Sequence, residues 1–199
     1  MRFGLLALIL LLSACAAVVD DAPQATDAEI VAKAYRAPGP ASLTIMTMVN
    51  NRSGSGGHTA LMINASQRVI FDPAGSFVND RVPEQNDVLY GVSPAVLAGY
   101  RSAHARSTYH IVSQTIEVTP EQAEIALQLA QQAGPVPRAL CTTATTGLLQ
   151  QVPGFEFIDQ VMFPTRLMQQ LEGRPDEATE RYYEDDEGNI LDGVAKVQL

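Results

Sequence analysis

The 199-residue chain predicts a single α+β domain in which an antiparallel sheet packs against helices. Segments rich in β-formers dominate its first half and capped helical segments its second half. This segregation is typical of α+β folds and differs from the alternation that builds a parallel sheet. The length suits one domain with a substantial core and is too short for two.

Residues 1–14 are predicted to be a secretory signal peptide, because one positive charge precedes an unbroken apolar run. The run is too short to span a bilayer, so it does not predict a transmembrane helix. Residues 12–15 read LSAC and resemble the bacterial lipobox, in which Cys15 is lipidated and becomes the first residue of the mature chain. The alternative is an ordinary signal peptide cleaved near Ala17. Because Ala16 rather than an aspartate follows the cysteine, the resemblance implies anchoring in the outer membrane, facing the periplasm.

Residues 15–41 are interpreted as a lipidated tether, with a short helix expected over residues 28–35, and the domain occupies residues 42–199. The formal net charge of −9 becomes −10 when residues 1–14 are removed, because Arg2 is their one charged residue. This acidity argues against binding to nucleic acid or electrostatic docking on anionic lipid. We therefore expect the membrane to be a partner only through the acyl anchor.

Alternating apolar and β-branched residues predict the strands of the sheet. These strands occupy residues 43–49, 58–63, 68–72, 87–91 and 109–118. A glycine-rich loop over residues 50–57 separates the first two, and a short turn joins the second to the third as a hairpin. The predicted sheet is therefore antiparallel.

Capping residues predict the helices. One helix begins after Ser93 and extends to about residue 105, and the clearest one follows Thr119, with Gln122 closing a capping box. Another begins on a proline and covers residues 164–171. The acidic tail, residues 173–192, is predicted to be a solvated hairpin, and because its carboxylates lack EF-hand spacing we expect no metal there.

Cys141 is expected in the first turn of a further helix, whose inward face would carry Leu140, Ala144 and Leu148. Unpaired amides and the positive end of the helix dipole lower the pKa of a thiol placed there. If Cys15 is acylated, Cys141 has no partner for an intramolecular disulfide in an oxidising compartment. It is then a small buried hydrophobe, an intermolecular link, or a thiol that the protein uses.

A cysteine hydrolase needs a base beside the thiol, and the chain has three histidines. His58 begins a strand directly after the glycine-rich loop, where a bare backbone lets another segment approach closely. His104 lies near a helix end, where histidine caps the C-terminus or lies in solvent, and His110 lies within a strand. We therefore favour His58 as the base.

Asp72 is the candidate for orienting His58, from which it is separated by fourteen positions across one turn. An odd number of turn residues would make the two residues direct neighbours, whereas an even number would put Asp72 on the opposite face. The register therefore decides this assignment. An aspartate before Pro73 also commonly serves only as a turn former, and Asn64, the other polar candidate, lies at the turn itself.

These residues resemble the circularly permuted branch of the NlpC/P60 papain-like superfamily. The resemblance covers roughly residues 42–172 and rests on GGHTAL at residues 56–61, VIFDPAG at residues 69–75 and LCTT at residues 140–143. It implies Cys141 as nucleophile, His58 as base and Asp72 as the orienting group. The third position departs from the family pattern, which commonly has histidine, asparagine, glutamine or glutamate at slightly different spacing.

The resemblance implies cleavage of an amide, peptide or acyl bond through a thioester on Cys141, without a cofactor or a catalytic metal. Cell-wall peptides would be one substrate class and acyl lipids another, because the permuted branch includes both amidohydrolases and acyltransferases. The alternative is a non-catalytic structural or binding lipoprotein of the cell envelope. The sequence therefore predicts a thiol hydrolase of the envelope and leaves its substrate open.

Overall fold

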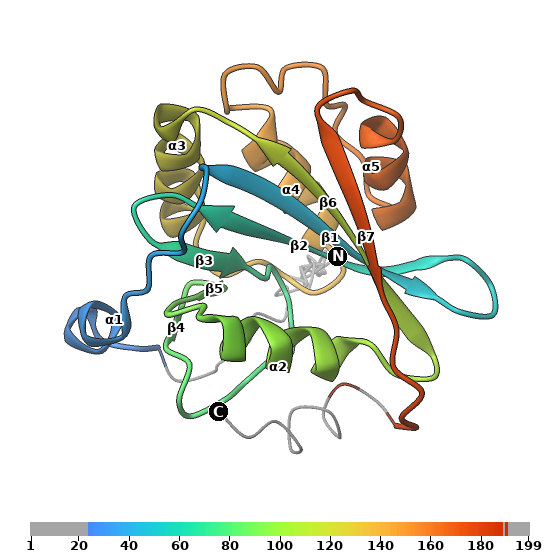
Figure 1. Ribbon diagram of the computed structural model, residues 1–199, viewed down its shortest axis with the longest axis horizontal. Helices are drawn as coiled ribbons and strands as arrows, with labels where there is room; N and C mark the ends of the chain where they lie inside the picture. Colours follow the sequence, from blue (N-terminus) through green and yellow to red (C-terminus); the bar gives the residue numbers. More distant parts are fainter. Residues whose placement is uncertain (1–23, 189, 191–199) are drawn as a thin grey trace, which may run out of the picture.

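The computed structural model describes residues 24–188 and residue 190, and they form one antiparallel sheet with helices on both faces (Figure 1). The sheet has seven strands in the order β4-β5-β3-β2-β1-β6-β7. This architecture confirms the predicted α+β class and the antiparallel sheet. Residues 1–14, with the predicted signal peptide, and Cys15, with the predicted lipidation site, lie outside the described residues.

Most of the elements follow the predicted segments, and one short strand, over residues 84–85, was not predicted. The strands are β1 (Ser42–Asn50), β2 (Gly56–Asn64), β3 (Arg68–Phe71), β4 (Glu84–Gln85), β5 (Val88–Leu89), β6 (Tyr109–Glu117) and β7 (Glu177–Tyr182). The helices are α1 (Asp27–Lys33), α2 (Pro94–His104), α3 (Pro120–Gln132), α4 (Cys141–Leu149) and α5 (Pro164–Leu171). Within the described part of the chain, no helix combines the length and apolarity needed to cross a membrane.

The central strand β1 is buried on both faces from Leu43 to Val49. Its side chains alternate between two cores, because successive residues of a strand point to opposite sides of the sheet. Leu43 and Ile45 belong to the core under α3, α4 and α5, while Met46 and Met48 belong to the core under α2. Figure 1 shows these two layers, with α2 on one side of the sheet and the other three helices across it.

The same alternation sorts the residues of β2. Leu61 and Ile63 pack with the three-helix layer, and Ala60 and Met62 face α2. By this parity His58 lies on the α2 face of the sheet and Thr59 on the face covered by α4. The candidate base, His58, is therefore on the α2 face of the sheet, and the next residue along β2 faces α4.

The described part of the predicted tether contacts the domain. Thr26 and Glu29 form a capping box at the start of α1, which lies within two residues of the expected helix. The backbone of Ala25 donates a hydrogen bond to the carbonyl of Glu84 at 2.7 Å, and Arg68 donates to the carbonyl of Tyr35 at 2.7 Å. Residues 24–35 therefore have defined positions against β3 and β4.

The acidic tail differs from the prediction. Instead of forming a separate hairpin, β7 pairs antiparallel with β6 over six residues and becomes an edge strand of the main sheet. The backbone groups along the outer edge of β6 need partners, and β7 supplies them. The tail is solvated as expected, since most of its side chains are exposed.

Candidate active site

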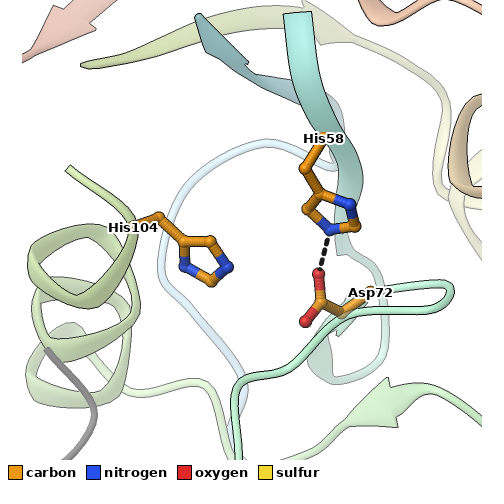
Figure 2. Close-up of side chains that lie close together, drawn as sticks. All are labelled: His58, Asp72 and His104. Atoms are coloured by element: carbon orange, nitrogen blue, oxygen red, sulfur yellow. Dashed lines mark hydrogen bonds and ion pairs between the residues drawn. The ribbon is translucent and has the colours of Figure 1, made fainter. Parts of the chain in front are cut away.

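The β2–β3 hairpin brings His58 and Asp72 together. Asn64 pairs with Arg68, so the turn contains three residues and both side chains project from the same face. They are diagonal neighbours instead of directly opposite ones, because the register pairs Leu61 with Phe71. His58 Nε2 lies 2.7 Å from Asp72 Oδ1 (Figure 2). The odd turn thus gives the shared face that the sequence left open, with an offset that the simple count did not predict.

Tyr100 and His104 of α2 complete a buried network that the sequence analysis missed. The Tyr100 hydroxyl donates to Asp72 Oδ1 at 2.7 Å, so this oxygen accepts from both Tyr100 and His58. His104 Nδ1 lies 2.8 Å from the Tyr100 carbonyl, and its ring stacks 6.0 Å from that of His58. The signal was present in the sequence, because residues four apart share one helix face.

Gly75 is required by this packing. A Cβ at this position would collide with the Asp72 carboxylate and lie 2.8 Å from the Asp72 carbonyl oxygen. The Gly75 amide also donates to that carbonyl at 2.8 Å and closes the turn after β3. A glycine here therefore allows the carboxylate to fold back beneath His58.

The Cys141 thiol lies at the first residue of α4, as predicted, and is 8% exposed. Because Asp72 occupies Nε2, Nδ1 is the ring nitrogen left for the hydrogen bond between His58 and Cys141. The backbone amide of Thr59 also donates to the sulfur. This amide belongs to the part of β2 that extends beyond its pairing with β3, so the α4 N-terminus meets an uncovered strand edge.

The inward face of α4 is wider than predicted, and one predicted member, Leu140, lies outside it. Leu148 is buried in the core as predicted, and Ala144 packs against that core. Leu140 is 36% exposed and Ala144 only partly buried, whereas Thr142, Thr145 and Thr146 are fully buried. Two of these threonines have hydrogen-bond partners for their hydroxyls, and that of Thr146 donates to the Thr142 carbonyl at 2.9 Å. The hydroxyls of Thr142 and Thr59 lie 3.1 Å apart across the α4–β2 contact. The threonine run therefore places the helix against β2 and brings its first residue to His58.

Asp87 holds the two loops beside the site in position. Its carboxylate accepts the Ala74 amide at 3.0 Å and the Val136 amide at 2.8 Å, and its carbonyl accepts the Asp72 amide at 2.7 Å. The turn after Asp72 and the loop that leads to α4 are thus joined through one buried side chain. Just before the helix, Ala139 has a φ of 67°, a sparsely populated backbone conformation for a residue with a Cβ.

Burial and charge perturb the protonation of His58 and Asp72. Burial opposes the charge on His58, but the negative charge and hydrogen bond of Asp72 outweigh it and raise the pKa of His58 from 6.5 to about 10. Burial also disfavours ionisation of Asp72, yet the charge and hydrogen bond of His58 lower the pKa of this carboxyl. The two groups therefore stabilise each other as an ion pair.

The thiol is activated by the same contacts. Burial raises the pKa of Cys141, but the hydrogen bond and charge of His58 outweigh it, with help from the Thr59 amide and the Thr142 hydroxyl. The net effect lowers the pKa of Cys141 from 9.0 to about 7. A thiolate beside an imidazolium is therefore accessible near neutral pH, and thiolate is the nucleophilic form of cysteine.

His104 remains neutral in this cluster. Burial lowers the pKa of His104 from 6.5 to about 4; the charge of Asp72 opposes this shift, and that of His58 reinforces it. Since the Tyr100 carbonyl can only accept, the hydrogen of the His104 ring is on Nδ1 and a lone pair is on Nε2. His58, Asp72 and His104 offer ligand atoms within 4.8 Å of one another, so they could together hold a metal ion.

A pocket of about 360 Å³ opens beside His58 and His104. Gly75 and Ser76 line one side, and Met48 and Tyr109 contribute apolar surface. The pocket gives solutes access to the imidazole cluster from the α2 face. His110, the remaining histidine, lies apart from the cluster, with its Nδ1 2.7 Å from Asn51 Oδ1.

No family model, curated protein or solved structure matches this chain. The candidate site therefore rests on its own geometry. That geometry joins Cys141, His58 and Asp72, the residues singled out by sequence, and adds Tyr100 and His104 from α2.

Proposed function

We propose that this protein is a cysteine hydrolase in which Cys141 is the nucleophile, His58 the general base and Asp72 the group that orients the base. The observation that carries the proposal is that the His58 imidazole interacts with both Asp72 and Cys141. Its Nε2 is hydrogen-bonded to Asp72 at 2.7 Å, and its charge and hydrogen bond to the thiol lower the pKa of Cys141. Nucleophile, base and orienting group in this relation are the recurrent arrangement of covalent hydrolases.

Each group has a defined role in the proposed reaction. His58 Nδ1 holds the thiol proton in a thiolate–imidazolium pair, and the Cys141 sulfur attacks the carbonyl carbon of an amide or acyl bond. The leaving group departs with the proton from His58, and a thioester remains on Cys141. Water, deprotonated by His58, then releases the acid and restores the thiol. Asp72 keeps the imidazole in the required orientation and stabilises its charged form.

The start of α4 supplies charge stabilisation for the developing oxyanion. The first amides of a helix have no intrahelical acceptor, and no side chain in the described part of the protein caps this helix. The backbone amide of Cys141 is thus the natural first donor to the oxyanion of the tetrahedral intermediate. The helix dipole favours negative charge at the same place.

The chain order of these groups favours the circularly permuted NlpC/P60 type of papain-like fold as the architectural class. The histidine comes from β2 and the aspartate directly follows β3, both early in the domain, and the cysteine follows later at a helix start. We further propose that Cys15 is lipidated and anchors the enzyme in the bacterial envelope, at the outer membrane and facing the periplasm. Cell-wall peptides and acyl lipids are the substrate classes that such a location offers.

The test uses the full chain carrying Cys15→Ser, so that Cys141 is its one thiol. This protein is incubated with muropeptides and, separately, with phospholipid vesicles, in the presence of a chelator. We expect hydrolysis of one substrate class, a thioester adduct on Cys141 detectable by mass spectrometry, and loss of both in Cys141→Ala. The control variant His110→Ala should retain both.

The two substrate arms distinguish the candidate activities. Release of peptide or amide products identifies a cell-wall hydrolase, and release of fatty acid identifies a lipid acyl hydrolase. If neither substrate yields a Cys141-dependent product or adduct, the hydrolase proposal fails and a non-catalytic envelope lipoprotein becomes the better description.

A further inference from the structure

We propose that His58, Asp72 and His104 form a binding site for a divalent transition-metal ion such as Zn²⁺, and that occupancy of this site stops turnover by the thiol. The regulatory half of this inference rests on the proposed hydrolase function, whereas the binding half does not. Two imidazole nitrogens and one carboxylate oxygen form a donor set that suits zinc.

The first observation is the convergence of the three side chains. Their ligand atoms lie within 4.8 Å of one another, although they come from β2, the turn after β3 and the last residue of α2 (Figure 2). Ligands around a tetrahedral zinc ion lie roughly 3.3 Å apart, given bond lengths of about 2.0–2.1 Å. His58 and Asp72, now 2.7 Å apart, need to separate by about 0.6 Å to admit the ion, and the wider pairs need to close by up to about 1.5 Å.

The second observation is the state of His104. Its Nε2 is buried and has no hydrogen-bond partner among the described residues, and only 7% of the residue is exposed. A buried polar atom without a partner is costly and calls for an explanation. Figure 2 shows this free edge of the ring turned toward Asp72 and His58.

The surroundings of His104 match those of a metal ligand. Its Nδ1 donates to the Tyr100 carbonyl at 2.8 Å, which fixes the tautomer and leaves the Nε2 lone pair pointing into the cluster. Metal-binding histidines are commonly oriented by such a bond from the second ring nitrogen. Tyr100 likewise holds Asp72 through its hydroxyl at 2.7 Å, so two of the three ligands are already positioned.

The pocket beside the cluster provides an entry path for a cation. His58 and His104 both line it, so an ion can reach the cluster from solvent. Arg106, which also lines the pocket, is paired with Asp186 at 3.0 Å and Glu184 at 3.8 Å. Its positive charge is thus offset by two carboxylates.

Occupancy would interrupt catalysis at the base. The ion takes the lone pair of His58 Nε2, and the proton formerly shared with Asp72 is released to solvent. The neutral ring then keeps its one hydrogen on Nδ1, next to Cys141. With both nitrogens engaged, His58 cannot accept the proton of a thiol or of water, and turnover stops. The sulfur itself remains uncoordinated.

Binding is tested by titrating Zn²⁺ into the full chain carrying Cys15→Ser and Cys141→Ala, with isothermal calorimetry as the readout. We expect one ion per chain without any thiol present. His104→Asn keeps a donor for the Tyr100 carbonyl but removes the ligand nitrogen, and it should weaken binding by at least about tenfold. His110→Asn, a matched change at the histidine outside the cluster, should leave the affinity unchanged.

Substitution with Co²⁺ gives a second measurement that leaves all three ligands intact. In the chain with Cys141 present, the cobalt spectrum should lack a thiolate-to-metal charge-transfer band, because the metal is held by nitrogen and oxygen. A thiolate band, loss of zinc binding in Cys141→Ala, or unchanged binding in a folded His104→Asn variant would each overturn the proposed site. Any of these results would locate the metal elsewhere.

The regulatory half is tested on the substrate identified for the hydrolase. Saturating Zn²⁺ should make turnover at least about tenfold slower than it is with chelator. In His104→Asn, the rates with chelator and with Zn²⁺ should be nearly equal. Cys141 should still react with iodoacetamide in the zinc-bound protein. If the protein binds zinc but has no hydrolase activity, the metal site stands and the hydrolase proposal fails. If the protein is an active hydrolase that binds no zinc, the hydrolase proposal stands and the metal site fails.

Discussion

Replacing His58 with alanine should raise the pKa of Cys141 by about two units or more, because the imidazole is the main group that stabilises the thiolate. In the native protein this pKa is about 7, compared with an ordinary value of 9.0. Without His58, the charge and hydrogen bond that offset the burial of the thiol are lost. The remaining burial then raises the pKa of Cys141 to its ordinary value or above.

The size of the effect on reactivity follows from two opposing changes. At pH 7 the thiolate fraction falls from about one half to about one hundredth, a loss of about 50-fold. A more basic thiolate is intrinsically more nucleophilic, with a Brønsted slope of about 0.4–0.5, and this increases the reactivity of the remaining thiolate about eightfold. The net expectation is alkylation about sixfold slower at pH 7, together with a pH–rate midpoint near 9 or higher.

The assay is the rate of reaction with iodoacetamide from pH 5 to 10, measured on the full chain carrying Cys15→Ser with a chelator present. Reactivity should rise through about pH 7 in this protein and in the control His110→Ala. Cys141→Ala reports the background. A native midpoint close to 9, or a His58→Ala midpoint that does not move, would refute the inferred coupling between the imidazole and the thiol.

Three further substitutions test the support of the site. Gly75→Ala should displace the Asp72 carboxylate and raise the pH midpoint for alkylation of Cys141. Gly147→Ala is the control, because its Cβ would meet its nearest neighbour at an ordinary 3.4 Å and should leave that midpoint unchanged. Alkylation rates measured against pH compare the two variants. Tyr100→Phe removes a hydrogen bond to a carboxylate and should cost roughly 1.5–3 kcal/mol of unfolding free energy in urea titrations, and unchanged stability would contradict this. Asp87→Ala leaves two backbone amides without their acceptor and should cost at least about 2 kcal/mol while slowing alkylation; a stable variant with native reactivity would show that this link is dispensable.

Much of the fold could be predicted from local chemistry. The caps Ser93 and Thr119 begin α2 and α3 as expected, because their hydroxyls accept the third helical amides in both cases. The start of α4 at Cys141 also agrees with the prediction, since proline and glycine upstream exclude a longer helix. These features depend on a few neighbouring residues, so a sequence pattern can identify them.

Features that depend on partners distant in the sequence were predicted less well. The α4 helix also turns threonines inward, where β2 offers Thr59 as a hydroxyl partner for Thr142. Hydrophobic spacing correctly identifies Leu148 as buried but does not predict the buried threonines. Likewise, β7 joins the sheet because β6 has a free edge, and the sequence of the acidic tail does not indicate that β6 is its partner. In both cases an interaction absent from the local sequence outweighs local preference.

The amino-acid sequence alone determined which residue types were available for thiol chemistry: one cysteine at a helix start, a histidine at a strand start and an aspartate after the next strand. Tertiary structure decided their relation. A three-residue turn set the register that joins His58 to Asp72, and α2 added Tyr100 and His104 from across the core. The physical reason is that residue identity and capping act over a few positions, whereas a hydrogen bond of 2.7 Å depends on how whole elements pack.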